Sequence, residues 1–283
     1  MIKSMKTARL VSNSIVYAIL TIMSIIWLIP IAWVVLSSFR GEGGAFVPYF
    51  IPKTFTLDNY IKLFTNDIFP FGRWYANTFI IAIVNCVLNT TMTLSTAFVL
   101  SRMRFGLRKT YLIVALVLGM FPGFMSTIAV YYILKALGLT QNLLALILVY
   151  AGGAGLNFYI SKGFFDTLPR ALDEAARLDG ANNATLFFKI ILPLSKPIIV
   201  YTALMSFMAP WLDFVLARII MGDNYNMYTV APGLFAMIQR QFISEYFVVF
   251  AAGCVCVAIP TAALFMSLQR FYVEGVTGGS VKG

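Results

Sequence analysis

Long runs of sequence without any Asp, Glu, Lys or Arg restrict this chain to a membrane fold. Six such runs cover residues 14–38, 74–101, 110–134, 136–161, 197–212 and 246–269. A helix needs about 20 apolar residues to cross a bilayer, and most of these runs exceed that length. The fifth is short unless it continues beyond Asp213. Since 60% of the residues are hydrophobic and only 11% are charged, we predict an all-α integral membrane protein with six transmembrane helices.

The positive charges predict how the chain is oriented. If the N-terminus is cytoplasmic, the cytoplasmic segments hold 14 of the 21 Lys and Arg residues, and such an excess is typical of cytoplasmic loops. We therefore expect a single transmembrane domain over residues 1–283 with both termini in the cytoplasm. Residues 39–73 and 218–245 form extracellular loops, and residues 166–193 form a cytoplasmic loop. This topology accounts for the net charge of +10. We therefore expect membrane lipid around the chain and no nucleic-acid partner.

The sequence lacks the residue patterns of most catalytic and metal sites. It contains no His, and its three Cys residues lie inside apolar runs, whereas zinc sites are usually built from several Cys and His side chains. No Gly-rich loop ends in Lys-Ser or Lys-Thr, the pattern that holds nucleotide phosphates. The glycine cluster at 151–155 suits close packing of helices instead. We therefore predict no catalytic residue, no metal and no cofactor in this chain, so that any ATP is hydrolysed by another chain.

The segment DEAARLDGANNATLFFKIILP, residues 173–193, is the most polar passage in the middle of the chain. Pro169 suits the start of a helix, with acidic residues in its first turn, and Gly180 suits its end. After the glycine the chain becomes apolar again toward Pro193. We expect a short helix, a turn and a second helix, the first with one small apolar face formed by Leu168, Leu172, Ala175 and Ala176. From amphipathicity alone, such a helix could also lie along the lipid headgroups.

The spacing within this segment is more specific than its amphipathicity. Glu174-Ala175-Ala176 is followed by three residues, Gly180, nine residues, Ile190, one residue and Leu192-Pro193. This pattern resembles the EAA motif of permease subunits in binding-protein-dependent ABC importers. In that family the motif forms a coupling helix that docks into a cleft of the ATPase subunit. The resemblance implies a type I ABC importer permease architecture, and roles in ATPase coupling for Glu174, Ala175, Ala176, Gly180, Ile190, Leu192 and Pro193.

Two further segments, residues 229–236 and 268–283, resemble the smaller permease of maltose/maltodextrin-type sugar importers, the MalG type. The resemblance implies transport of a sugar, first of all maltodextrin, across a bacterial plasma membrane. It also implies three partners: a paralogous second permease, a homodimeric ATPase that binds ATP and Mg²⁺, and an extracellular or periplasmic sugar-binding protein. The alternatives are a permease for another oligosaccharide or neutral solute and, from another class, an ion-coupled secondary transporter.

Polar side chains inside transmembrane runs are costly, so they mark a possible path for the substrate. Trp211 offers an aromatic face to a sugar ring, while Asp213 could bind sugar hydroxyls or form an interfacial pair with Arg218. The candidates for the path are Asn85, Asn89, Asn157, Tyr159, Tyr201, Trp211 and Asp213.

Overall fold

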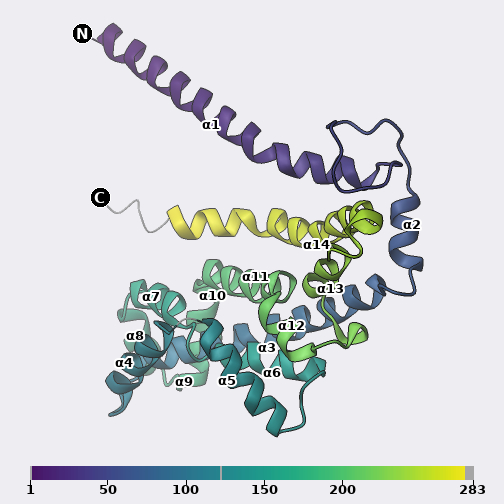
Figure 1. Cartoon of the computed structure of the whole chain (residues 1–283). Helices are drawn as coiled ribbons and strands as arrows, with labels where there is room; N and C mark the ends of the chain where they lie inside the picture. Colours follow the sequence, from purple (N-terminus) through teal and green to yellow (C-terminus); the bar gives the residue numbers. More distant parts are fainter. Residues whose placement is uncertain (1, 122, 278–283) are drawn as a thin grey trace. The chain divides into compact units, whose positions relative to one another are not determined.

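The computed structural model of this chain describes residues 2–121 and 123–277, which are mainly helical (Figure 1). They form two compact units, one within Met1–Ile68 and Ala236–Cys256 and the other within Phe69–Phe235 and Val257–Gly283. Residues 278–283, the end of a segment that resembles the sugar permeases, lie outside the described residues.

The first unit contains α1 (Ile2–Ser38), α2 (Asp58–Thr65) and the beginning of α14 (Ile243–Thr277). From Leu10 to Ile31, α1 exposes its large apolar side chains on every side. A helix that is apolar all round belongs in a membrane or against another protein. This helix therefore has the surface of a transmembrane span.

The loop between α1 and α2 is ordered around Arg40, which is only 2% exposed. The Arg40 guanidinium donates hydrogen bonds to the carbonyl oxygens of Glu42 and Gly44 and lies 5.9 Å from the ring centroid of Phe247. Thr56 Oγ1 accepts a hydrogen bond of 3.0 Å from the N–H of Asp58, where α2 begins.

The second unit is built around α3 (Phe71–Arg102), which packs along α11 (Lys196–Leu212), α7 (Tyr159–Thr167) and α6 (Leu143–Gly153). An apolar core at the Arg102 end of α3 includes Phe98, Phe165 and Leu186. The remaining elements are α4 (Arg108–Gly119), α5 (Gly123–Ala136), α8 (Ala171–Leu178), α9 (Asn183–Thr185), the π-helical turn η1 (Leu186–Ile191), α10 (Leu192–Leu194), α12 (Val215–Met221), the 3₁₀ turn η2 (Tyr225–Met227) and α13 (Val230–Met237).

The described helices match the six predicted runs only in part. Three helices are long and apolar enough to cross a membrane, namely Arg9–Ser38, Phe71–Arg102 and Ile243–Gln269, and they match the first, second and sixth runs. A fourth crossing is formed if Asn183–Leu194 and Lys196–Leu212, which meet at an angle of 87°, count as one bent span.

The third run holds most of α4 and α5, and the fourth run holds α6 and only the first residues of α7. The sequence at these two breaks is GMFPG and AGGAG, and both Gly and Pro are poor helix formers. The six runs therefore do not correspond to six unbroken helices.

Candidate functional site

The hairpin that carries the EAA-like spacing is closed by Gly180. This glycine has φ +82°, a left-handed conformation that glycine adopts readily. Its N–H donates to the carbonyl of Arg177 at 3.1 Å, and the N–H of Ala181 donates to the carbonyl of Ala176 at 2.9 Å. These two bonds form a Schellman motif, and they confirm the predicted end of the helix after Leu178.

The two faces of α8 differ from the faces that the sequence predicts. Asp173 and Ala176 are its buried residues, whereas Ala175 is exposed and Leu172 is 38% exposed. Of the expected apolar face, Leu168 and Ala176 do pack against the core, but Leu172 and Ala175 do not; Asp173 takes part in the inner face instead, where it forms an ion pair with Arg102. The outer face of α8 carries Glu174, Ala175, Arg177 and Leu178, and Leu178 is 89% exposed.

The second half of the hairpin anchors the helix to the core. Asn182 Oδ1 accepts a hydrogen bond of 2.8 Å from the N–H of Thr185, which caps the next helical segment. Ile190 and Leu192 pack against the same core cluster as Ala176, and Pro193 is exposed just before the 87° bend. Among the motif residues, Glu174 and Ala175 are therefore exposed on α8, Gly180 and Pro193 are exposed at the turn and before the bend, and Ala176, Ile190 and Leu192 pack against the core.

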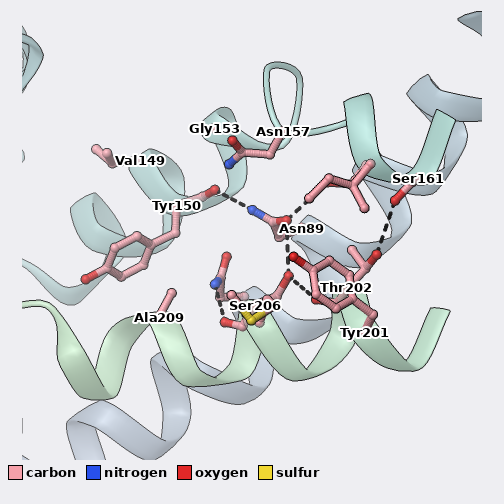
Figure 2. Close-up of a pocket in the computed structure, with 14 residues that line it drawn as sticks. Asn89, Val149, Tyr150, Gly153, Asn157, Ser161, Tyr201, Thr202, Ser206 and Ala209 are labelled. Atoms are coloured by element: carbon pink, nitrogen blue, oxygen red, sulfur yellow. Dashed lines mark hydrogen bonds between the residues drawn. The ribbon is translucent and has the colours of Figure 1, made fainter. Parts of the chain in front are cut away.

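A cavity of about 460 Å³ lies in the second unit between α3, α6, α7 and α11 (Figure 2). Four of the predicted path residues line it, namely Asn85, Asn89, Asn157 and Tyr201. The lining also includes polar residues that the sequence analysis missed: Thr93, Tyr150, Ser161, Thr202 and Ser206.

Asn89 lies at the centre of the polar wall of this cavity (Figure 2). Its side-chain Nδ2 donates to the carbonyl of Tyr150 at 2.8 Å, which joins α3 to α6. Its Oδ1 lies 3.2 Å from Thr93 Oγ1 and 3.1 Å from Ser206 Oγ. One amide thus fixes three elements, and it sets where the neighbouring hydroxyl groups lie.

Asn85 leaves an acceptor unused beside the cavity. Its Nδ2 donates to the carbonyl of Ser206 at 2.6 Å, while its buried Oδ1 has no hydrogen-bond partner among the described residues. A buried polar atom without a partner is costly unless a ligand or water satisfies it. Asn85 Oδ1 can therefore accept a hydrogen bond from a hydroxyl group in the cavity.

The other three predicted path residues do not line the cavity. Trp211 is 2% exposed, and its ring packs against Tyr75 with centroids 5.2 Å apart. The Tyr159 hydroxyl donates to the carbonyl of Leu112. Asp213 Oδ2 accepts a hydrogen bond of 2.6 Å from the Tyr150 hydroxyl.

The interfacial pair of Asp213 with Arg218 is not formed. Arg218 Nη2 instead lies 3.0 Å from Asp223 Oδ1. Asp213 therefore does not line the cavity, but it accepts a hydrogen bond from Tyr150, which does.

A spacing rule could have found several of the residues that were missed. Asn85, Asn89 and Thr93 recur every four residues, which places them on one face of a helix. Thr202 and Ser206 have the same spacing in α11. Among the side chains that the structure describes, no group of three or more Cys, Asp or Glu is placed to hold a metal ion.

The membrane-length helix α3, packed with shorter helices around a polar cavity and with an amphipathic hairpin at one end, is typical of a membrane transport subunit. The solved structures show the same fold. The chain superimposes on a chain of a bacterial ABC transporter that imports the acidic polysaccharide alginate with a TM-score of 0.78 and 20% identity, covering 93% of this chain and 96% of that one. For the MetNI methionine ABC transporter, the TM-score is 0.56 at 17% identity, with 72% and 95% covered.

The family follows from sequence matches. Residues 89–277 match the family model of the binding-protein-dependent transport system inner membrane component, and the chain belongs to this family. It is 35% identical to the galactooligosaccharides transport system permease protein GanQ of Bacillus subtilis (strain 168), covering 100% of both chains. It is also 35% identical to the maltodextrin transport system permease protein MdxG of the same organism, covering 98% of this chain and 99% of MdxG.

Family membership settles the class of protein. The chain is a multi-pass permease of the inner or plasma membrane in an ABC importer, and it works with a binding protein and an ATPase. It is the membrane component and not itself the ATPase. The alternative of an ion-coupled secondary transporter is therefore wrong.

Proposed function

We propose that this permease subunit imports a neutral oligosaccharide, with maltodextrin as the first candidate. The observation that carries the proposal is the character of the cavity wall. None of the 14 described residues that line the cavity carries a charge, and most present an amide or a hydroxyl group. Such groups suit sugar hydroxyls, whereas an acidic polysaccharide would need cations to replace its lost hydration.

The relatives support a sugar of this kind and supply a second candidate. MdxG is named for maltodextrin and GanQ for galactooligosaccharides, at equal identity to this chain. The maltodextrin transport system permease protein MalD of Streptococcus pneumoniae is 31% identical over 99% of both chains. Galactooligosaccharide is therefore the second candidate, and it too is neutral and rich in hydroxyl groups.

The proposed architecture is that of a type I ABC importer permease, with six membrane crossings in one domain over residues 1–283. The broken pair α4–α5 supplies the third crossing, α6 with the beginning of α7 supplies the fourth, and the bent α10–α11 pair supplies the fifth. Both termini lie in the cytoplasm, because this orientation gives the cytoplasmic segments the excess of Lys and Arg. The loops 39–73 and 218–245 then face a sugar-binding protein outside the cell.

The coupling mechanism uses the hairpin at 166–193. A homodimeric ATPase that binds ATP and Mg²⁺ grips α8, and a paralogous second permease completes the path. Glu174 and Ala175 are exposed on α8, while Ala176, Ile190 and Leu192 pack against the core. Closure of the ATPase then favours one of two states of the permease pair, because the ATPase makes different contacts with each state.

Uptake into proteoliposomes tests the proposal. The chain is reconstituted with its second permease, ATPase and binding protein, and uptake of radiolabelled maltotriose, galactotriose and acidic trigalacturonic acid is compared. We expect ATP-dependent uptake of a neutral trisaccharide, negligible uptake of the acidic one, and loss of all uptake in Glu174→Lys. Uptake of trigalacturonic acid in preference to both neutral sugars would contradict the proposal. Preference for galactotriose over maltotriose would select the second candidate.

A further inference from the structure

The last residue of α3 joins three helices of the second unit. The Arg102 side chain is 0% exposed, and its Nη1 lies 3.3 Å from Asp173 Oδ2 in α8. Its Nη2 donates to the carbonyl of Phe165 at 2.9 Å and to the carbonyl of Leu168 at 3.1 Å, at the end of α7. One buried guanidinium thus connects α3, α7 and α8, and the last two lie at the same end of the unit (Figure 1).

The end of α3 is held from the other direction as well. Arg108 Nε donates to the carbonyl of Leu100 at 2.8 Å, and Arg170 Nη2 donates to the carbonyl of Ser101 at 3.2 Å. The last carbonyl groups of a helix have no partner within the helix, and cations are favourable there. Arginine side chains therefore donate hydrogen bonds to the free carbonyl groups at the ends of both α3 and α7, and they hold these two ends together.

The ion pair between Arg102 and Asp173 is not arranged for maximum stability. Arg102 Nε and Nη1 and Asp173 Oδ1 are buried without a hydrogen-bond partner in the described part of the chain, so the 3.3 Å contact is an ion pair without a hydrogen bond. Buried ion pairs with such unsatisfied atoms often contribute less stability than apolar packing would. What the contact does provide is a charge link between α3 and α8, while the two carbonyl bonds of Arg102 Nη2 fix the guanidinium plane against the end of α7.

We propose that Arg102 is a positioning residue that transmits the movement of α8 to α3. This inference rests on the proposed function, since it takes α8 as the helix that the ATPase grips. When the ATPase moves α8, Asp173 moves with it, and the guanidinium carries the displacement to the helix that holds Asn85 and Asn89 in the cavity wall. Arg102 does not touch the sugar, and its effect is on how much sugar moves for each ATP hydrolysed.

The test uses the complete complex in proteoliposomes and measures maltotriose uptake and ATP hydrolysis in the same preparation. In Arg102→Lys the positive charge remains, but a single ammonium group cannot reproduce the planar bonds to two carbonyls together with the ion pair to Asp173. We expect the variant complex to assemble and to hydrolyse ATP, with the ratio of sugar to ATP reduced about ten-fold. Asp173→Asn keeps the shape of the side chain and removes its charge, and it should change the ratio in the same direction.

Arg104→Lys is the matched control, because Arg104 is exposed two residues beyond Arg102. Its ratio should equal that of the wild type. A general loss of stability would lower uptake and hydrolysis together and leave the ratio unchanged, so the ratio separates transmission from a purely structural role. If the Arg102→Lys complex fails to assemble, the ratio of sugar to ATP measured in Asp173→Asn tests the inference in its place. A wild-type ratio in every variant that assembles overturns the inference.

A second variant separates this inference from the proposed function. Glu174→Lys should release the ATPase subunits from the purified complex. If the ATPase stays bound in Glu174→Lys, α8 is not the docking helix, and the proposed coupling fails together with the inference. If the ATPase is released but Arg102→Lys and Asp173→Asn keep the wild-type ratio, only the role of Arg102 is overturned.

Discussion

At the scale of the residue, Gly180 combines a strict conformational demand with open space. An added Cβ would meet no atom within 4 Å, so the penalty for a side chain is in the backbone. A left-handed conformation costs an L-residue about 1–2 kcal/mol. We expect Gly180→Ala to lower the midpoint of thermal unfolding of the purified complex by about 2–4 °C.

Gly163 supplies a matched control for this substitution. It lies inside α7, is exposed, and also has open space around an added Cβ. Because alanine favours a helix interior over glycine by about 0.5–1 kcal/mol, Gly163→Ala should raise the unfolding midpoint. Equal effects of the two substitutions would show that the φ of Gly180 does not determine its contribution.

Residue-level predictions from the sequence succeeded where the cause was local. The turn at Gly180 depends on residues within one hairpin, so its spacing was enough to place it. The orientation of α8 depends on Arg102, which is distant in sequence, and no periodicity within 171–178 reveals that Asp173 points inward. In the same way, Trp211 was predicted for the substrate path but packs against Tyr75 of another helix.

At the scale of the element, the contact between α3 and α7 predicts a defined dependence on pH. Asp166 Oδ1 accepts a hydrogen bond of 2.7 Å from Ser101 in α3, and Lys162 Nζ lies 2.6 Å from Asp166 Oδ2. Burial raises the pKa of Asp166, but hydrogen bonds from Lys162 and Ser101 and the charges of Lys162 and Arg108 outweigh it, so the pKa lies below its usual value. Asp166 therefore stabilises the fold as a carboxylate.

We expect Asp166→Asn to reduce the free energy of unfolding by about 0.5 kcal/mol at pH 7, a small value because the pair is partly exposed. A lowered pKa gives stability that is fully present above the unfolded pKa, about 4, and is lost as pH falls through the folded pKa. Thermal unfolding of both proteins between pH 8 and 5 should therefore show a constant difference. A difference that changes across this range would mean that another group is responsible.

The elements also show why the membrane crossings were only partly predictable. A run without charged residues marks a segment that prefers lipid, and three of the six runs match α1, α3 and α14. The absence of charge does not register a break inside such a run, because Gly and Pro at 119–123 and Gly at 152–155 interrupt a helix without adding charge. The bend before α11 was predicted only as a return to the membrane near Pro193, and its angle of 87° depends on packing of η1 against the core.

At the scale of the whole molecule, two exposed apolar surfaces of this chain differ in what can cover them. α1 exposes apolar side chains on all sides, as a span surrounded by lipid does, whereas α8 exposes Leu178 by 89% beside the charged Glu174. An apolar side chain on a charged hairpin outside the membrane is favourable only if a partner covers it. The proposed ATPase cleft supplies such a cover.

Leu178→Glu tests whether this side chain is buried by the ATPase. Full burial of a leucine is worth about 1.5–3 kcal/mol, so its replacement by a carboxylate should weaken binding of the ATPase about ten- to a hundred-fold. The measurement is a titration of labelled ATPase onto the permease pair in lipid nanodiscs. The control is Leu107→Glu, since Leu107 is 72% exposed in the loop between α3 and α4 and lies outside α8. Weakening by Leu178→Glu alone places the ATPase on α8, whereas equal affinities for both variants and the wild type would place it elsewhere on the permease.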